Sequence, residues 1–149
     1  MPEGFHTVTP YLTLKNAAKA IQFYKDAFGA KEIEIHHAED GRILNASIQI
    51  GNSMVMLCDE FPEFGCGTLS PQSMKGTTIV LHIYVEDVDA LFNQALHAGA
   101  KVKMPVENMF WGDRYGQLED PFGYFWSIAT RIADESTLED SHSQQCCKH

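Results

Sequence analysis

The chain has 149 residues, 44% of them hydrophobic, and a formal net charge of −9 at neutral pH. This length and apolar content suit one domain, or two small halves that share a core. The acidic balance argues against nucleic acid as a partner, because phosphate binding needs clustered Lys and Arg, and the 11 present are scattered. The longest apolar runs are strand-length and MPEGFHT has no signal pattern, so we expect a cytoplasmic protein without a membrane partner.

The first half of the chain alternates between strand-like and helix-like patterns. A short alternating apolar segment precedes an amphipathic stretch that begins after Asn16, a helix N-cap residue, and stops at Gly29. Strands are then expected at 33–38, 43–50 and 53–58. Gly51-Asn52 between the last two strands is a hairpin turn signal. The run 60–77, rich in Pro and Gly, predicts a linker.

The second half repeats this order. LTLKNAAKAIQFYKDAFGAK resembles IYVEDVDALFNQALHAGAK, so that Asp87 and Gly99 stand where Asn16 and Gly29 stood. GRILNASIQIGNSMVML aligns with DRYGQLEDPFGYFWSIA in the same way, which sets Gly51 against Gly123. Strands are expected after the second helix at 101–106, 115–118 and 123–130.

The repeat predicts two tandem modules of the order β-α-β-β-β. Module one is expected at about 7–59 and module two at about 78–131, joined by the linker at 60–77 into a single domain over 1–132. The final stretch, 133–149, is acidic and polar with little to bury, and is expected to be disordered.

Several motifs carry a resemblance to a known family. The repeat itself, "FYKDAFGAK", "HIYVEDVDALF" and "MFWGDRYGQLEDPFGYFWSIAT" resemble the vicinal oxygen chelate superfamily of glyoxalases, bleomycin resistance proteins and extradiol dioxygenases, in its PhnB-like branch. The resemblance covers roughly residues 7–132. It implies an α+β fold, the glyoxalase/bleomycin-resistance fold, whose two modules form a curved mixed sheet around a U-shaped cleft. Such clefts often lie within a homodimer, so we expect a homodimer here.

Strand side chains alternate, so one face of each strand packs under the helices and the other lines the cleft. The repeat pairs apolar residues that we assign to the helix side: Leu12, Leu14, Met54, Met56, Ile83, Val85, Trp126 and Ile128. By elimination, the cleft is expected to receive Thr9, Tyr11, Thr13, Asn45, Ser47, Gln49, Ser53, Val55, Leu57, Val80, His82, Tyr84, Tyr115, Gln117, Glu119, Phe125, Ser127 and Ala129.

The resemblance also implies where a metal would be held. Metal-dependent members of the superfamily use His, Glu or Gln at four symmetry-related positions, which fall here on Thr9, Val55, Val80 and Ser127. A hydroxyl or an alkyl group cannot replace imidazole or carboxylate as a ligand for a divalent ion. We therefore expect no metal at these positions. No Gly-rich loop opens a helix after a strand either, so no nucleotide-like cofactor is expected.

His82, Glu119 and Tyr115 fall on the expected cleft face. His82 and Glu119 could serve as a general acid and base, since imidazole titrates near neutral pH and a half-buried carboxylate can be tuned toward it. The alternative, which we favour, is that His82 bonds a strand neighbour and only lines the pocket.

The ligand-binding candidates are mostly aromatic, and Arg114 could add a bidentate clamp for an anion. Arg114 could equally pair with Asp113 or a second subunit, since Arg42 occupies the same place in module one within a "DGR" turn. The candidates are Tyr11, Tyr84, Trp111, Arg114, Tyr115 and Phe125.

The leading hypothesis is a metal-free protein that binds a small molecule in the cleft between modules. The resemblance supports it, because resistance proteins of the superfamily bind drugs without converting them. The rival hypothesis is a lyase, isomerase or dioxygenase-type enzyme that uses His82 and Glu119, or a metal site moved to those side chains.

Overall fold

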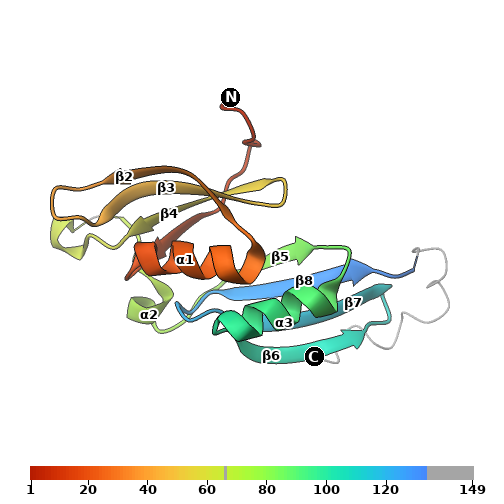
Figure 1. Cartoon of the computed structure of the whole chain (residues 1–149). Helices are drawn as coiled ribbons and strands as arrows, with labels where there is room; N and C mark the ends of the chain where they lie inside the picture. The colour runs from red at the N-terminus through yellow and green to blue at the C-terminus, as the bar shows by residue number, and fades with distance from the viewer. Residues whose placement is uncertain (66, 134–149) are drawn as a thin grey trace.

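The computed structural model describes residues 1–65 and 67–133 (Figure 1). The prediction of a disordered tail concerns residues of which all but one lie outside the described residues. In chain order the elements are β1 (Tyr11–Leu14), α1 (Ala17–Phe28), β2 (Lys31–His37), β3 (Ile43–Ile50), β4 (Ser53–Asp59), the 3-10 turn η1 (Pro62–Phe64), α2 (Pro71–Met74), β5 (Val80–Tyr84), α3 (Val88–Ala98), β6 (Lys101–Asn108), β7 (Asp113–Glu119) and β8 (Phe125–Arg131). No helix in these described ranges has the length and apolar character needed to cross a membrane.

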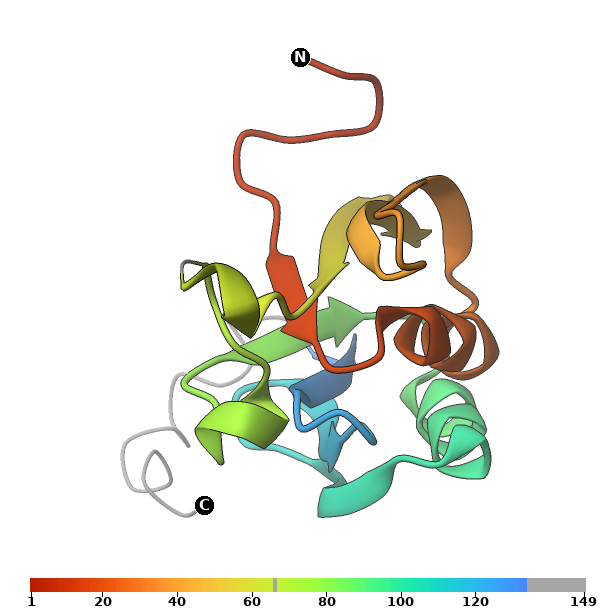
Figure 2. The ribbon, with the colours of Figure 1, turned by 90° about the vertical axis from the view of Figure 1, so that its left-hand side faces the viewer.

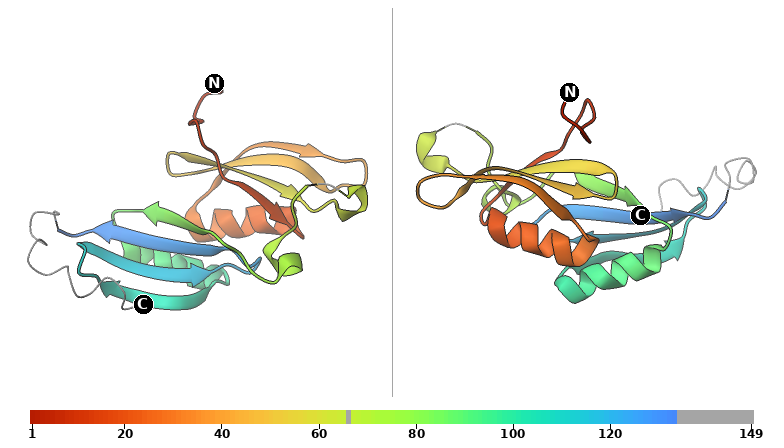
Figure 3. Two further views of the ribbon diagram at one scale, coloured as in Figure 1. Left: turned by 180° about the vertical axis from the view of Figure 1, so that it is seen from behind. Right: turned by 45° about the horizontal axis from the view of Figure 1, so that its top comes forward.

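The predicted fold class is confirmed, because the same four-stranded sheet occurs twice. The first sheet has the order β1-β4-β3-β2 and the second has the order β5-β8-β7-β6. In each sheet the first strand of the module runs parallel to the last, and the other neighbours are antiparallel. η1 and α2 lie in the predicted linker between the sheets (Figure 3).

The two long helices begin and end at the residues that the repeat identified. Asn16 Oδ1 accepts a hydrogen bond from the backbone N–H of Lys19, and Asp87 does the same for Ala90. Gly29 and Gly99 end the helices with φ of 69° and 122°, a region that side chains with a Cβ rarely adopt.

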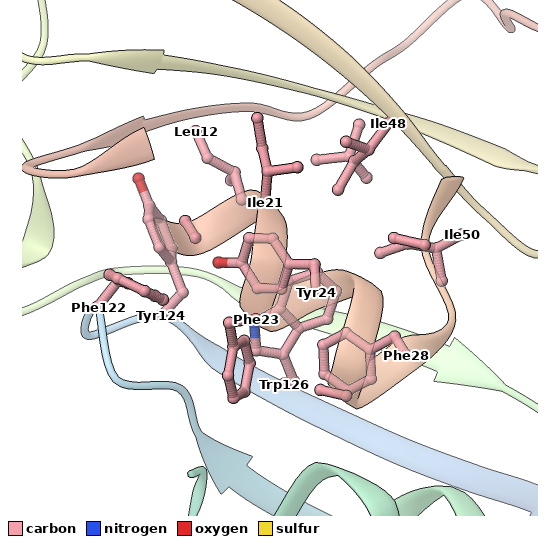
Figure 4. Close-up of a cluster of buried hydrophobic side chains, with 14 of the residues drawn as sticks. Leu12, Ile21, Phe23, Tyr24, Phe28, Ile48, Ile50, Phe122, Tyr124 and Trp126 are labelled. Atoms are coloured by element: carbon pink, nitrogen blue, oxygen red, sulfur yellow. The ribbon is translucent and has the colours of Figure 1, made fainter. Parts of the chain in front are cut away.

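The modules meet through their helices. α1 and α3 lie side by side and pack against each other, as Figure 2 shows end-on. Aromatic side chains of α1 interlock with residues from the end of module two: the rings of Phe28 and Trp126 are 4.7 Å apart, and those of Tyr24 and Trp126 are 5.3 Å apart (Figure 4). Phe23 packs edge-on against Phe122. The two halves thus share one core.

A buried carboxylate fixes this junction. Asp120, 3% exposed, accepts hydrogen bonds from Tyr24 Oη at 2.6 Å and Trp126 Nε1 at 2.9 Å. Its other oxygen accepts the backbone N–H groups of Phe122 and Tyr124. The turn between β7 and β8 therefore ties β8 to α1.

The register of β4 differs from the prediction. Leu12 pairs with Leu57 and both are buried beside α1, which places Val55 and Leu57 on the helix side and Met54 and Met56 on the other. The assignment of β4 was therefore wrong by one residue. A shift of one residue moves every side chain of a strand to the opposite face.

The error comes from the hairpin turns. Ile50 pairs with Ser53 across a two-residue turn, whereas Glu119 pairs with Phe125 across the longer loop 120–124. Aligning the turn glycines of the two hairpins ignored this difference. The other strands of the predicted cleft face keep the predicted alternation, because the observed pairings put His82 beside Ser127 and Gln117.

Candidate ligand site on the second sheet

The face of the second sheet that does not pack on the helices, called here the open face, gathers polar and aromatic side chains. Cross-strand neighbours share a face of a sheet. The pairings align His82, Ser127 and Gln117 in one row across β5, β8 and β7. Tyr84 and Tyr115 flank Ala129 in the next row.

His82 is held in a defined orientation. Its Nδ1 lies 2.6 Å from Ser127 Oγ, and Ser127 itself is buried. The imidazole meets the ring of Tyr84 edge-on at 4.5 Å and lies nearly parallel to that of Tyr115 at 6.0 Å. Partial burial lowers the pKa of His82 below its ordinary value of 6.5, although the charge of Asp113 opposes this shift. The imidazole is therefore neutral at pH 7, and Nε2 is the ring nitrogen left for a ligand.

Asp113 accepts hydrogen bonds from two of these aromatic residues. Although only 2% exposed, its Oδ2 accepts a hydrogen bond from Tyr84 Oη at 2.8 Å and another from Trp111 Nε1 at 3.1 Å. Its Oδ1 lies 3.1 Å from Arg131 Nε, an ion pair without hydrogen-bond geometry. The hydrogen bond to Asp113 raises the pKa of Tyr84, so the phenol stays protonated.

Four rings thus form a cluster, called here the ring cluster: His82, Tyr84, Trp111 and Tyr115. Trp111 completes it, with its ring edge-on to Tyr115 at 5.7 Å. The residues come from β5, β7 and the loop between β6 and β7. Aromatic faces of this kind offer a large apolar contact area with hydrogen-bonding groups at the rim.

A crevice adjoins the ring cluster. It has a volume of about 620 Å³ and lies between the N-terminal segment, the β3–β4 hairpin and β5. His82 and Tyr84 line it from β5, facing His6 and Thr9 of the N-terminal segment. The crevice therefore lies along β5, and its lining also includes Phe28, Leu91 and Trp126 from the helix side.

Other predicted site residues lie elsewhere. Glu119 pairs with Lys103 at 3.3 Å and stands opposite Phe125, while Gln117 occupies the row of His82. The structure therefore does not bring Glu119 to His82. Phe125 lies on the open face with its ring 5.4 Å from the Lys103 ammonium group.

Tyr11 and Arg114 are also separate from the ring cluster. Tyr11 belongs to the first sheet, where its hydroxyl accepts a hydrogen bond from Asn45 Nδ2 at 2.8 Å. Arg114 extends from the helix side of β7 and grips Asp89 of α3 with two hydrogen bonds of 2.8 and 3.0 Å. Arg114 was expected to clamp an anion, to pair with Asp113 or to pair with a second subunit; the structure pairs it with Asp89 and not with Asp113.

Sequence reasoning missed the role of Asp113. It considered this acid only together with Arg114, and Ser127 as a cleft residue at a lost metal position but not as the partner of His82. Alternation along β7 was a signal that could have separated Asp113 from Arg114, because adjacent strand residues point to opposite faces.

Comparison with known proteins agrees with this architecture. The family model described as Glyoxalase/Bleomycin resistance protein/Dioxygenase superfamily matches residues 4–128. The chain belongs to this superfamily. An uncharacterized protein of Mycobacterium tuberculosis is 41% identical over 129 residues, which cover 85% of this chain and 75% of the relative. An uncharacterized protein of Arabidopsis thaliana is 30% identical over 132 residues, covering 78% and 75%.

Solved structures share the fold. TioX from Micromonospora sp. ML1 is similar with a TM-score of 0.69 at 21% identity, over 85% of this chain and 99% of TioX. A mutant of FosX, a fosfomycin resistance protein from Listeria monocytogenes complexed with Mn(II), has a TM-score of 0.66 at 15% identity, over 95% and 100%. At these identities the likeness concerns the fold alone.

The residues at the superfamily's metal positions do not suit a divalent ion. Val55 is buried among the core residues on the helix side. Its neighbour Met56, which pairs with Tyr11, lies on the other face of β4. Val80 offers an alkyl group, and the Ser127 hydroxyl is engaged with His82. Within the described ranges, no three His, Cys, Asp or Glu side chains come together in a group that could hold a metal. The donor set thus disagrees with a metal centre of the superfamily type.

Proposed function

We propose that the protein binds a small, uncharged molecule with an aromatic ring on the open face of the second sheet, without a divalent metal or other cofactor. The ring cluster carries this proposal, because its four rings from three segments form an apolar surface around one oriented imidazole. A planar ligand can stack on the exposed faces of Tyr84 and Tyr115 while a polar group reaches His82.

The charges of the site favour a neutral ligand. The carboxylate of Asp113 is matched by Arg131, and that of Glu119 by Lys103. The imidazole of His82 is neutral at pH 7 because burial lowers its pKa. Among the described residues of the ring cluster and its partners, no charge is left unmatched to repay the desolvation of a charged ligand.

The crevice has a suitable size. Ligand pockets for small organic molecules have volumes of roughly 300–1,000 Å³, and the crevice beside the ring cluster has about 620 Å³. Its lining combines apolar residues such as Val80 with the polar groups of His82 and Thr9.

We further propose that the binding cleft is completed in a homodimer. The first sheet also has a face that does not pack on the helices, called here the first open face, and the two sheets share one core. Tyr84 on one open face and Tyr11 on the other are about half exposed, at 56% and 50%. A second copy could present its Tyr11 face to the ring cluster and enclose the ligand.

Screening by thermal shift tests the proposed binding. We expect uncharged planar aromatic compounds, 2-naphthol among them, to raise the melting temperature of the wild type. His82→Ala and Tyr115→Ala should each weaken binding by about tenfold. Failure of the whole aromatic panel to stabilise the wild type would refute the proposal.

Metal and mass measurements test its other parts. Chelator-washed protein should hold less than one divalent ion per two chains, and added Mn(II) or Zn(II) should leave ligand affinity unchanged. Light scattering should give twice the chain mass. One tightly held ion per chain would overturn the metal-free proposal, and a monomer at working concentration would overturn the dimer.

An enzyme remains the second candidate, because the bond to Ser127 orients His82 as a general base requires. Glu119 is not its partner in this arrangement, since it pairs with Lys103. Mass spectrometry of a bound compound after long incubation separates the two candidates: an unchanged compound supports binding alone, and a converted one supports catalysis.

A further inference from the structure

We propose that Asp113 is the positioning residue of the ring cluster: it orients Tyr84 and Trp111 and so sets the affinity for an aromatic ligand. This inference rests on the proposed function, although its first test does not need a ligand. It assigns to Asp113 a role different from anion binding with Arg114, whose guanidinium grips Asp89 on the helix side.

One carboxylate oxygen of Asp113 accepts hydrogen bonds from two side chains. Its Oδ2 receives the phenol hydroxyl of Tyr84 at 2.8 Å and the indole N–H of Trp111 at 3.1 Å. These side chains belong to different elements, one to β5 and the other to the loop between β6 and β7. A single oxygen of Asp113 therefore holds two aromatic side chains from separate segments in fixed relative positions.

Burial separates this role from direct binding. At 2% exposure, Asp113 is not a contact surface for a ligand, whereas Tyr84 is 56% exposed. Arg131 supplies the balancing positive charge, and it also donates from Nη1 to the carbonyl of Trp111 at 3.2 Å. Beside this positive charge, the buried carboxylate can accept both hydrogen bonds strongly.

The loop that carries Trp111 depends on the same residue. The backbone N–H of Met109 donates to the carbonyl of Asp113 at 2.7 Å, and Gly112 donates to Met109 at 3.2 Å. This tight turn joins β6 to β7. The side chain of Asp113 then holds the indole that the turn delivers.

Comparison of the two modules indicates that the acid is not part of the shared framework. Leu57 and Ile128 each pair with the first strand of their module, at Leu12 and Ile83, and lie opposite Ala46 and Gly116. Counting back three residues equates Asp113 with Ile43, and not with Gly41 as the alignment of the two sequences had it. An isoleucine supports the same strand in module one without any hydrogen bond from its side chain. The acid therefore belongs to what distinguishes the second sheet, namely its ring cluster.

The first test examines the ligand-free protein by NMR with ¹⁵N labelling. The chain has only two tryptophans, so the spectrum contains two indole N–H signals. In Asp113→Asn we expect the Trp111 signal to shift and its exchange with water to accelerate by about tenfold. The signal of Trp126, which is bonded to Asp120 at 2.9 Å, should stay in place and report that the core is intact.

The second test measures the affinity for 2-naphthol by calorimetry. Asp113→Asn should weaken binding by about tenfold, since two aromatic walls lose a charged acceptor. Asp89→Asn is the matched control: it removes a carboxylate that pairs with the neighbouring residue of β7 outside the site, and should change the affinity by less than about twofold. If Asp113→Asn does not fold, Tyr84→Phe removes the same hydrogen bond from the other side, and we expect it to weaken binding about threefold.

The outcomes are distinguishable. An unmoved Trp111 signal, or an affinity of Asp113→Asn within about twofold of wild type, would overturn the positioning role. If His82→Ala and Tyr115→Ala still weaken binding in that case, the proposed function stands without it. If 2-naphthol and the rest of the aromatic panel fail to bind the wild type, the proposed function falls, while the NMR signals still decide whether Asp113 holds Trp111.

Discussion

Replacing Tyr24 by Phe removes one hydroxyl group from the buried junction between the modules and leaves the ring in place. That hydroxyl donates to Asp120 at 2.6 Å, and both residues are buried. Burial, followed by the charge of Asp120, raises the pKa of Tyr24 well above its ordinary value, so the hydroxyl stays protonated and donates at every accessible pH. The variant therefore isolates one hydrogen bond to a buried carboxylate.

The magnitude follows from the acceptor. Hydrogen bonds to charged groups contribute about 1.5–3 kcal/mol to stability. The ring stacking of Tyr24 on Phe28 at 6.1 Å, and its contact with Trp126, should survive in the variant. Asp120 also keeps the indole N–H of Trp126. We therefore expect a loss of about 2 kcal/mol in the free energy of unfolding, and a fall of several degrees in melting temperature.

Urea denaturation followed by circular dichroism measures this loss. The midpoint should fall while the slope of the transition stays constant, because the surface exposed on unfolding does not change. Tyr11→Phe is the matched control: its hydroxyl lies on a half-exposed ring, accepts from Asn45 and bonds Cys58 but no buried carboxylate, so the variant should lose less than about 0.5 kcal/mol. A loss of under about 0.5 kcal/mol for Tyr24→Phe as well would refute the assignment of Asp120 as the clamp between modules.

Three further outcomes are expected. Gly116→Ala should destabilise the protein by about 1–3 kcal/mol, since its new Cβ would lie 2.8 Å from Val106 and 2.9 Å from Phe92; unchanged urea unfolding would contradict this packing. Burial raises the pKa of Asp120 above its ordinary 3.8, so its contribution to stability is fully present below that value and is lost as pH rises through the folded pKa; urea midpoints between pH 3 and pH 7 should show this trend relative to Asp120→Asn, and parallel profiles would contradict it. Arg114→Gln breaks an exposed ion pair on the helix side and should leave 2-naphthol affinity unchanged by calorimetry, whereas a tenfold loss would return Arg114 to the binding site.

The fold could be predicted from the sequence because each module carries its own local signals twice. Asn16 and Asp87 cap the helices and Gly29 and Gly99 end them in both the prediction and the structure. These signals depend on the backbone of a few neighbouring residues, so they do not require knowledge of tertiary contacts.

The candidate site could be predicted only in part. The open-face position of His82, Tyr84 and Tyr115 follows from strand alternation, and the structure gathers these three rings together. The placement of Val55 did not follow, because turn lengths differ between the hairpins and the repeat was aligned on turn glycines. Contacts between distant segments could not be predicted either. Neither the ion pair of Glu119 with Lys103 nor the hydrogen bonds that Asp113 accepts from Tyr84 and Trp111 have a local sequence pattern.

The aromatic junction determines how the protein loses its structure. Trp126 belongs to module two but packs against Tyr24 and Phe28 of module one, and Asp120 accepts hydrogen bonds from both Tyr24 and Trp126. Unfolding of either half would expose apolar surface of the other half and break the hydrogen bond between Tyr24 and Asp120. Although duplicated in sequence, the chain should therefore melt as one cooperative unit, with equal calorimetric and van't Hoff enthalpies, and neither half should fold when expressed by itself.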